Sequence, residues 1–349
     1  MTEGRVVTDK RATIADVARA LDLTKSTVSR AMNGFPDIAQ ATRLRVQRMA
    51  EVMNYQPLSH AQAIKTGITR SLGLVLQLSD HDAHRPFLAE FLAGVSASAS
   101  TKGYTLTVAS ADTHADLITN FRTLMRDGKA DGFILPRAMV EDPRVTYLQD
   151  AGVPFVLYGR PPKSKGCSWF DIRGEDAMRH AVQHLAQLGH RRIGFVNGGS
   201  VYAYAELRLQ GFLVGMQAAG LQTDPAMIMQ NAVTETDGFA AAEQLLDRAV
   251  RPSAIVCAID QAALGIYRAA QARGLQIGQD LSVTGYDGIQ AGAQAQPPLT
   301  TFGVDNNAAC LRLATLLICL IRGTPPTLLR DTATATFLVR GSTGPPVTS

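Results

Sequence analysis

Side chains that donate hydrogen bonds gather between residues 24 and 33. Lys25 and Ser26 are the first exposed positions of an expected helix, and Arg30 lies one turn further along. Lys and Arg suit the acceptors of guanine, whereas Ser is permissive. Short donors that suit phosphate oxygens alternate with them: Thr24, Thr27, Ser29 and Asn33. These residue types indicate DNA contact, with the first set reading bases and the second fixing position.

The elements that must hold these residues are short helices. Thr13 with Asp16 predicts a capped helix start, and Thr24 can cap a second helix that runs to about Met32. Asn33-Gly34 is a stop signal. A third helix is expected at 41–54. Two helices joined by a tight turn predict a helix-turn-helix, whose second helix enters the major groove. From the spacing alone, the alternative is a small helical bundle with a solvated polar face.

The charge distribution supports a small DNA-facing module. The chain of 349 residues has a net charge of +4. Residues 1–67 hold 10 Lys or Arg and 6 Asp or Glu, whereas residues 68–349 hold 24 of each. The whole excess of positive charge, 10 minus 6, therefore lies in the first fifth of the chain. Such an asymmetry suggests a module facing a polyanion, attached to a neutral body.

From Ser71 onward, apolar strand-like runs alternate with helical stretches. Strands are expected at 72–78, 104–108, 132–135, 153–158, 192–196, 254–258 and 281–285. Helices are expected at 87–102, 116–127, 175–188, 208–219, 238–249 and 261–273. This alternation predicts an α/β fold with parallel sheets. The runs form two sets, before and after 167–171, so we expect two doubly wound lobes with a ligand in the cleft between them.

The stretch TIADVARALDLTKSTVSRAMNGFPDIAQATRLRVQRMAEVMNYQP, residues 13–57, resembles the headpiece of the lactose/galactose-repressor family of bacterial transcription regulators. The resemblance continues in the body to about Gly341. Its motifs are Leu188-Gly189-His190, Arg208-Leu209-Gln210-Gly211-Phe212, Asp260-Gln261, Gly285-Tyr286-Asp287 and Pro298-Leu299-Thr300-Thr301. The family implies an all-α headpiece at 1–57, a hinge helix and linker at 58–70, a periplasmic-binding-protein-like body at 71–341 and a tail at 342–349. Its N-lobe would take about 71–171 and 302–330, and its C-lobe about 172–301 and 331–341.

The resemblance also implies roles for residues of the headpiece and hinge. Lys25, Ser26 and Arg30 occupy base-reading positions. Phosphate-contacting positions are occupied by Thr24, Thr27, Ser29, Asn33, Thr42 and Tyr55. Ala39 stands where the family usually has a capping Ser. The hinge residues that would enter the minor groove are Ala61, Ile64 and Lys65, with Ile64 as the apolar wedge. A core role is the alternative for Ile64.

In the body, Arg208 and Asp287 match the effector-binding Arg and Asp of the family, and Phe87 matches a cleft aromatic. Arg is a fork of donors and Asp accepts from sugar hydroxyls. Tyr202, Tyr204 and Trp169 are candidates to stack on a sugar ring, with core or rim packing as the alternative for each. Two departures, Ile259 for a usual Asn and Gly159 for a frequent Asp, predict a less polar cleft.

Several classes of protein are disfavoured. The sequence contains no GxGxxG, GxxxxGK[ST], GxSxG or HExxH motif, so no enzyme is expected. Neither the seven histidines nor the four cysteines show ligand spacing, so we expect no metal and no cofactor. No N-terminal run resembles a signal peptide, which favours a cytoplasmic protein over an exported sugar-binding transport component.

The prediction is therefore a homodimeric repressor that binds palindromic operator DNA and has no membrane association. Its effector is expected to be a sugar or disaccharide. A nucleobase corepressor is the alternative, and the sequence does not decide whether the effector releases or promotes DNA binding.

Overall fold

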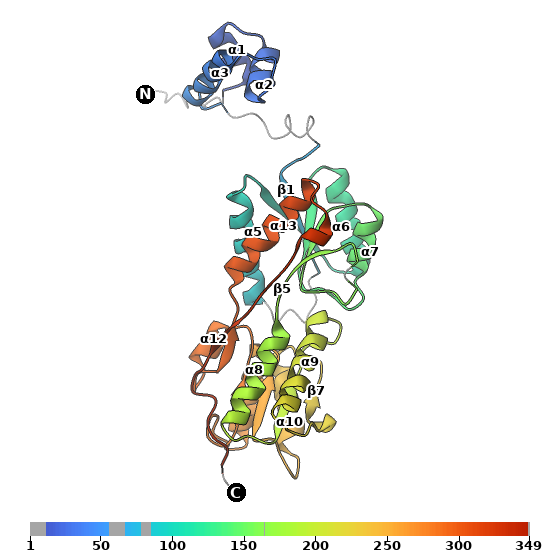
Figure 1. Cartoon of the computed structure of the whole chain (residues 1–349), viewed down its shortest axis with the longest axis vertical. Coiled ribbons are helices and arrows are strands. Elements are labelled where there is room, and N and C mark those ends of the chain that lie inside the picture. Colours follow the sequence, from blue (N-terminus) through green and yellow to red (C-terminus); the bar gives the residue numbers. More distant parts are fainter. Residues whose placement is uncertain (1–11, 56–66, 78–84, 164, 348–349) are drawn as a thin grey trace, which may run out of the picture. The chain divides into compact units, whose positions relative to one another are not determined.

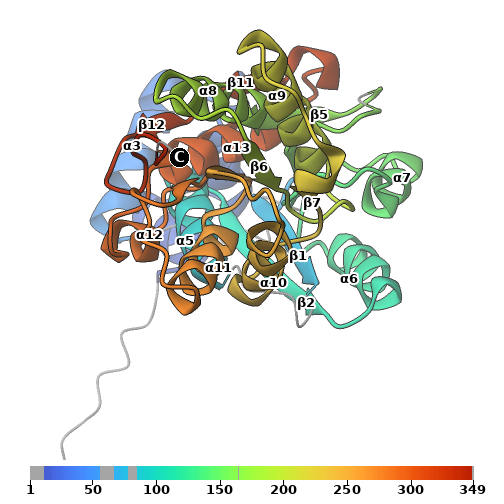
Figure 2. The same cartoon turned by 90° about the horizontal axis from the view of Figure 1, so that it is seen from below.

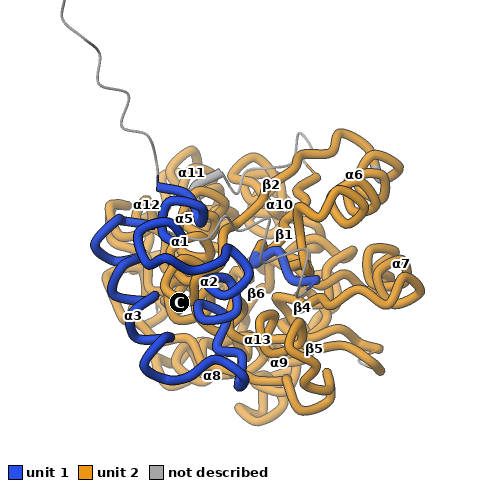
Figure 3. The backbone as a smooth tube through the Cα atoms, turned by 90° about the horizontal axis from the view of Figure 1, so that it is seen from above, with its two compact units in different colours: residues 1–70 blue, residues 71–349 orange. Residues whose placement is uncertain are grey.

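The computed structural model describes residues 12–55, 67–77, 85–163 and 165–347, apart from the side chains at 85–87 and 114. The chain divides into two compact units, Met1–Arg70 and Ser71–Ser349 (Figure 3). The predicted hinge residues Ala61, Ile64 and Lys65 lie outside the described residues.

The first unit contains the three expected headpiece helices, α1 (Ile14–Leu21), α2 (Lys25–Met32) and α3 (Gln40–Val52). Thr13 and Asp16 form a capping box at the start of α1, and the Thr24 side chain accepts from the Thr27 N–H at 3.0 Å to cap α2. Ala39 precedes α3 without a side-chain cap. A small core closes the bundle: Val17, Ala18, Val28, Ala31 and Val46. The predicted helix-turn-helix is confirmed.

The N-lobe of the second unit is a six-stranded parallel sheet in the order β11-β5-β4-β3-β1-β2. Its strands are β1 (Ser71–Gln77), β2 (Thr105–Ala111), β3 (Gly132–Leu135), β4 (Phe155–Tyr158), β5 (Ser168–Ile172) and β11 (Arg330–Ala333). Helices α5 (Arg85–Ser100) and α13 (Asn306–Ile321) cover one face and lie side by side (Figure 1). Helices α6 (His114–Arg126) and α7 (Pro143–Asp150) cover the other face.

The C-lobe is a four-stranded parallel sheet in the order β7-β6-β8-β9. Its strands are β6 (Ile193–Val196), β7 (Ile228–Met229), β8 (Ala254–Cys257) and β9 (Ser282–Thr284). The helices are α8 (Gly174–Gln187), α9 (Ala203–Ala218), α10 (Glu235–Leu246), α11 (Asp260–Ala272) and the short α12 (Gln290–Gln294). Figure 2 shows α8 beside α9 on one side of the sheet and α10 beside α11 on the other.

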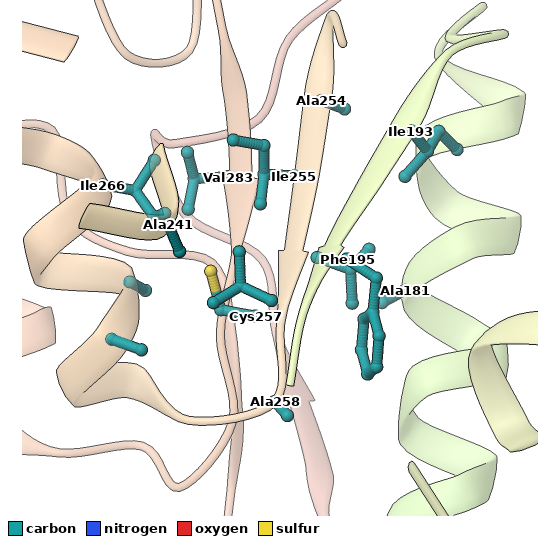
Figure 4. Packing of buried hydrophobic residues seen from close by; sticks show 14 of the residues in the cluster. Ala181, Ile193, Phe195, Ala241, Ala254, Ile255, Cys257, Ala258, Ile266 and Val283 are labelled. Atoms are coloured by element: carbon teal, nitrogen blue, oxygen red, sulfur yellow. The ribbon is translucent and has the colours of Figure 1, made fainter. Parts of the chain in front are cut away.

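Apolar side chains on both faces of the C-lobe sheet join the helices to it. Phe195 on β6 lies toward Ala181 of α8, whereas Cys257 on β8 lies toward Ala241 and Ile266 (Figure 4). A Cβ at Gly211 would lie 2.1 Å from the carbonyl oxygen of Glu175, so α9 approaches α8 this closely only because residue 211 is glycine. The predicted two-lobed α/β fold is confirmed.

The chain crosses between the lobes three times, and two crossings differ from the prediction. The N-lobe resumes with α13 at Asn306 rather than at 302, because β10 (Thr301–Gly303) pairs with β12 (Thr336–Leu338). In addition, Gly303 bridges to Asp287 of the C-lobe, and Thr300, just before β10, bridges to Thr284. The N-lobe sheet also continues through β11 to Ala333 rather than ending at 330.

The predicted tail begins too early. Ser342 is fully buried, and its hydroxyl donates to the Val283 carbonyl at 2.6 Å and accepts from the Thr300 N–H at 2.7 Å. Gly344 donates its N–H to the Ser282 hydroxyl at 3.0 Å. These bonds make residues 342–344 part of the C-lobe.

Within the described ranges, no helix combines the length and the apolar character needed to cross a membrane.

Candidate functional sites

Helix α2 presents the predicted base-reading residues to solvent. Lys25 and Ser26 are exposed, whereas Val28 and Ala31 on the opposite side are fully buried. This division follows from the helical period, which turns one face of α2 into the headpiece core. The exposed face leaves the start of α2 open to a groove.

The predicted phosphate-contacting donors are partly engaged with one another. The Thr24 and Thr27 hydroxyls lie 2.9 Å apart, and the Asn33 amide donates to the Ser29 carbonyl at 2.6 Å. Thr42 on α3 and Tyr55 are partly buried, and burial raises the pKa of Tyr55. All six residues lie on the described headpiece.

Arg30 differs from Lys25 because its side chain already has partners. Its guanidinium pairs with the Asp37 carboxylate, and its Cζ lies 4.9 Å from the centroid of the Phe35 ring. Sequence reasoning did not foresee either contact.

In the body, Arg208 on α9 lies between two aromatic rings. Its Cζ is 3.9 Å from the centroid of Tyr286 and 4.6 Å from that of Tyr204, and it donates a hydrogen bond to the Ala258 carbonyl. Such cation–π contacts, together with the bond to the carbonyl, fix the guanidinium in place. Its buried Nε has no hydrogen-bond partner among the described residues.

Asp287 follows Tyr286 directly and carries the unusual φ of 123°. Its N–H donates to the Phe302 carbonyl at 3.0 Å, which pins the strained backbone. Burial raises the pKa of Asp287 to about 7, and the nearby Arg208 guanidinium opposes that rise. The structure thus brings together Arg208 and Asp287, the two charged effector residues expected from sequence.

The N-lobe supplies residues that sequence reasoning missed. Arg137, with φ 53°, has its Cζ 5.9 Å from the Tyr202 ring centroid, and its charge, like that of Arg208, opposes the rise in the pKa of Asp287. Tyr158 ends β4, and its pKa is raised well above the ordinary value by burial first and then by its neighbours, including Tyr286 and Asp287. Both residues follow or end N-lobe strands, where a ligand of a parallel sheet is expected.

Backbone contacts hold the two lobes together beside these residues. Ala203 at the start of α9 donates its N–H to the Ala138 carbonyl at 2.9 Å, and Val140 donates to the Val201 carbonyl at 3.0 Å. Arg144 stabilises the N-lobe loop by donating to the Arg137 carbonyl at 3.0 Å and by pairing with Asp142 at 2.7 Å.

A second charged group links the lobes near the first crossing. Arg160, after β4, pairs with Glu175 on α8, and its Nε lies 3.6 Å from the Asp171 carboxylate. Burial raises the pKa of Asp171 to about 6, while Arg160 opposes the rise. We call the residues that gather where the lobes meet the interlobe cluster: Arg137, Tyr158, Asp171, Tyr202, Tyr204, Arg208, Tyr286 and Asp287.

Two of the predicted effector residues, Trp169 and Phe87, are not part of the interlobe cluster. Trp169 packs against the N-lobe core on the side of α6 and α7, and its buried indole N–H has no partner among the described residues. Phe87 falls in α5, but its side chain is outside the described residues. Tyr202, by contrast, stacks on Tyr204 with ring centroids 5.6 Å apart and belongs to the cluster.

The two departures from the family pattern have structural reasons. Gly159 has φ 110°, and a Cβ there would lie 3.2 Å from the Ala138 Cβ, so a side chain would be strained. Ile259 is buried in the C-lobe core. Neither residue has a polar side chain that could contact a ligand.

A hollow of about 300 Å³ lies beside α8, lined by residues that include Arg173, His180 and Phe302. None of the predicted effector residues lines it. Across the described part of the chain, no group of three His, Cys, Asp or Glu side chains could hold a metal ion. The interlobe cluster offers fixed donors, an acceptor and aromatic faces, a combination typical of ligand-binding sites.

Comparison with known proteins matches a family to part of each unit. Residues 13–58 match the bacterial regulatory proteins of the lacI family, and residues 182–343 match a periplasmic binding protein-like domain. The transcriptional regulator AglR of Rhizobium meliloti is 32% identical over 341 residues, which are 95% of this chain and 94% of AglR. RafR of Escherichia coli is also 32% identical, over 78% of this chain and 81% of its own length.

A solved complex of the regulator CelR with cellobiose superposes with a TM-score of 0.73 at 29% identity, over 95% of this chain and all of CelR. The headpiece, the two lobes and these similarities agree over nearly the whole length. The chain belongs to the lacI family of bacterial DNA-binding transcription regulators.

Proposed function

We propose that this regulator is a repressor that binds a palindromic operator as a homodimer and responds to a small sugar, most simply a disaccharide, held by the interlobe cluster. Lys25, Ser26 and Arg30 read bases in the major groove, while short donors such as Thr24 and Thr42 contact phosphates. The protein acts in the cytoplasm, on DNA.

The observation that carries the effector proposal is the fixed position of Arg208 between Tyr204 and Tyr286, next to Asp287. A sugar presents vicinal hydroxyls, which accept from a guanidinium and donate to a carboxylate. Its apolar ring face packs on aromatic rings. Tyr202, Tyr204 and Tyr286 supply such rings beside the two charged groups.

Two similarities support a sugar. The CelR structure is described as a cellobiose complex, and a ribose operon repressor of Haemophilus influenzae is 31% identical over 83% of this chain. A nucleobase is the second candidate because aromatic rings also stack on planar bases.

The test is calorimetry of the full-length protein against disaccharides, monosaccharides, sugar phosphates and nucleobases. A disaccharide should bind wild-type protein and fail to bind Arg208→Ala. Binding of a nucleobase alone would replace the sugar proposal with the second candidate. Light scattering after size exclusion should give a dimer, and a stable tetramer would contradict that part of the proposal.

A further inference from the structure

The chain reverses direction after α2, and this reversal brings the side chains of Phe35 and Asp37 back to Arg30. Gly34, with φ 70°, donates its N–H to the Ala31 carbonyl at 3.2 Å, and Phe35 donates to the Arg30 carbonyl at 3.1 Å. This pair of bonds is a Schellman motif, which reverses the chain after a helix. The reversal places the Phe35 ring 4.9 Å from the Arg30 Cζ.

The loop that follows is tied to the third helix. Arg43 on α3 donates to the Phe35 carbonyl at 2.9 Å, and the Ile38 N–H donates to the same carbonyl at 3.2 Å. The turn so formed carries Asp37, whose carboxylate pairs with Nη2 of Arg30. This is the only hydrogen bond that the Arg30 side chain makes within the described part of the chain, so Nη1 and Nε keep their donors.

We propose that Asp37 and Phe35 are positioning residues that hold the Arg30 guanidinium in one orientation for base reading, and so determine the specificity of the regulator. The proposal rests on the base-reading role of Arg30 proposed above. A guanidinium reads guanine through two parallel donors in a fixed plane. The Asp37 carboxylate holds one edge of the guanidinium, and the Phe35 ring covers one face. Arg30 therefore loses rotamer freedom before DNA binds, which lowers the entropic cost of binding.

The pair contributes little to folding. The Arg30 and Asp37 side chains are 45% and 50% exposed, and ion pairs with such exposure add almost nothing to stability. The effect of removing Asp37 should therefore appear in base discrimination rather than in unfolding. A carboxylate near DNA also repels phosphates, so its loss should raise affinity for any sequence.

The experiment measures two affinities for each full-length variant at one salt concentration. The first probe is a duplex selected by the wild-type protein from a randomised library, and the second is the same duplex with the Arg30-dependent base pair replaced. To find that base pair, each base pair of the duplex is replaced in turn. The Arg30-dependent pair is the one whose replacement weakens binding of the wild type but not of Arg30→Ala. Asp22→Asn is the matched control: Asp22 is exposed, its φ of 54° suits Asn, and the charge change is the same.

Asp37→Asn should lower the ratio of the two affinities about threefold to tenfold, whereas Asp22→Asn leaves it unchanged. Asp37→Glu should restore part of the ratio, and Arg30→Ala with Asp37→Asn should lose no more than Arg30→Ala alone. Unfolding midpoints of all variants are measured alongside.

An Asp37→Asn protein with the wild-type ratio, or a higher one, would overturn the positioning role. If Arg30→Ala loses discrimination while Asp37→Asn does not, Arg30 reads a base without help from Asp37. If Arg30→Ala itself discriminates at every base pair as the wild type does, the base-reading role fails and the positioning role fails with it.

Discussion

The headpiece and the interlobe cluster use the same kinds of side chain in opposite surroundings. In the headpiece, Lys25 is exposed, and the Arg30–Asp37 pair is about half exposed. In the body, Arg208 lies between two tyrosine rings, and burial raises the pKa of Asp287 to about 7. Charges in water interact weakly, whereas buried charges depend strongly on their partners.

The difference suggests how each region works. A solvated polyanion is recognised by separate, nearly additive contacts on an exposed helix. We propose that a small ligand between the two lobes is recognised by groups that also determine one another's ionisation, such as Arg208, Asp287 and Arg137. Changes in the headpiece should therefore be graded, whereas changes in the cluster should be severe and coupled.

The largest effect is expected for Arg208→Ala. It removes the guanidinium from between two rings and leaves Asp287 with less opposing charge, so effector affinity should fall at least about a hundredfold. Calorimetry with the sugar found for the wild type measures this. The control is Arg268→Ala. The Arg268 Cζ also lies over an aromatic ring, 5.5 Å from the Phe239 centroid, but this side chain pairs with Glu235 and is 59% exposed. Equal losses in both variants would remove the contrast between buried and exposed charges.

A smaller, graded effect is expected for Lys25→Ala. Loss of one exposed base contact should weaken binding to the selected duplex about tenfold, or 1.4 kcal/mol, with little change on random DNA. Fluorescence anisotropy at fixed salt measures both affinities. Arg45→Ala, which removes an exposed charge from α3, controls for charge alone. If Lys25→Ala lost affinity equally for the selected duplex and for random DNA, Lys25 would contact phosphates rather than read a base.

The third effect is on the stability of the fold, and it depends on pH. The pKa of Asp287 is about 7 in the folded protein but close to 3.9 in an unfolded chain. The folded state therefore holds the proton of this carboxyl group more tightly than the unfolded state does. The stability that the group contributes is complete below about pH 4 and is lost as pH rises through about 7.

In Asp287→Asn the side chain at this position does not titrate. The free energy of unfolding of this variant should therefore fall less than that of the wild type between about pH 5 and pH 8. A difference of about 1–3 kcal/mol is expected from chemical denaturation. The other buried carboxylates, including Asp171, are present in both proteins and cancel. Parallel pH profiles would mean that Asp287 is ionised throughout this range.

Local signals predicted the headpiece more closely than the body. Thr13, Thr24 and Gly34 mark helix ends through bonds within a few residues, so the sequence locates α1 and α2. The two lobes follow from periodicity, yet α7, α13, β5 and β11 were not predicted, and two crossings were displaced by several residues. The β10–β12 pair joins segments more than thirty residues apart, and no local pattern specifies such pairing.

The interlobe cluster also could be predicted only in part, because it joins residues far apart in the sequence. Arg208 and Asp287 were expected through family resemblance, and both lie in it. Arg137, Tyr158 and Asp171 come from separate N-lobe strands or loops, and only the folded sheet brings them near the C-lobe residues. The positive φ of Arg137 is a conformation that a sequence gives no reason to expect of arginine.

We propose that a ligand in the interlobe cluster changes the affinity of the headpiece for DNA. The most direct measurement is the affinity of the full-length protein for the selected duplex, with and without a saturating concentration of the sugar found by calorimetry. The DNA affinity of the wild type should change at least about fivefold on sugar binding, and that of Arg208→Ala should not change. Equal DNA affinities for the free and the sugar-saturated wild-type protein would contradict the proposal.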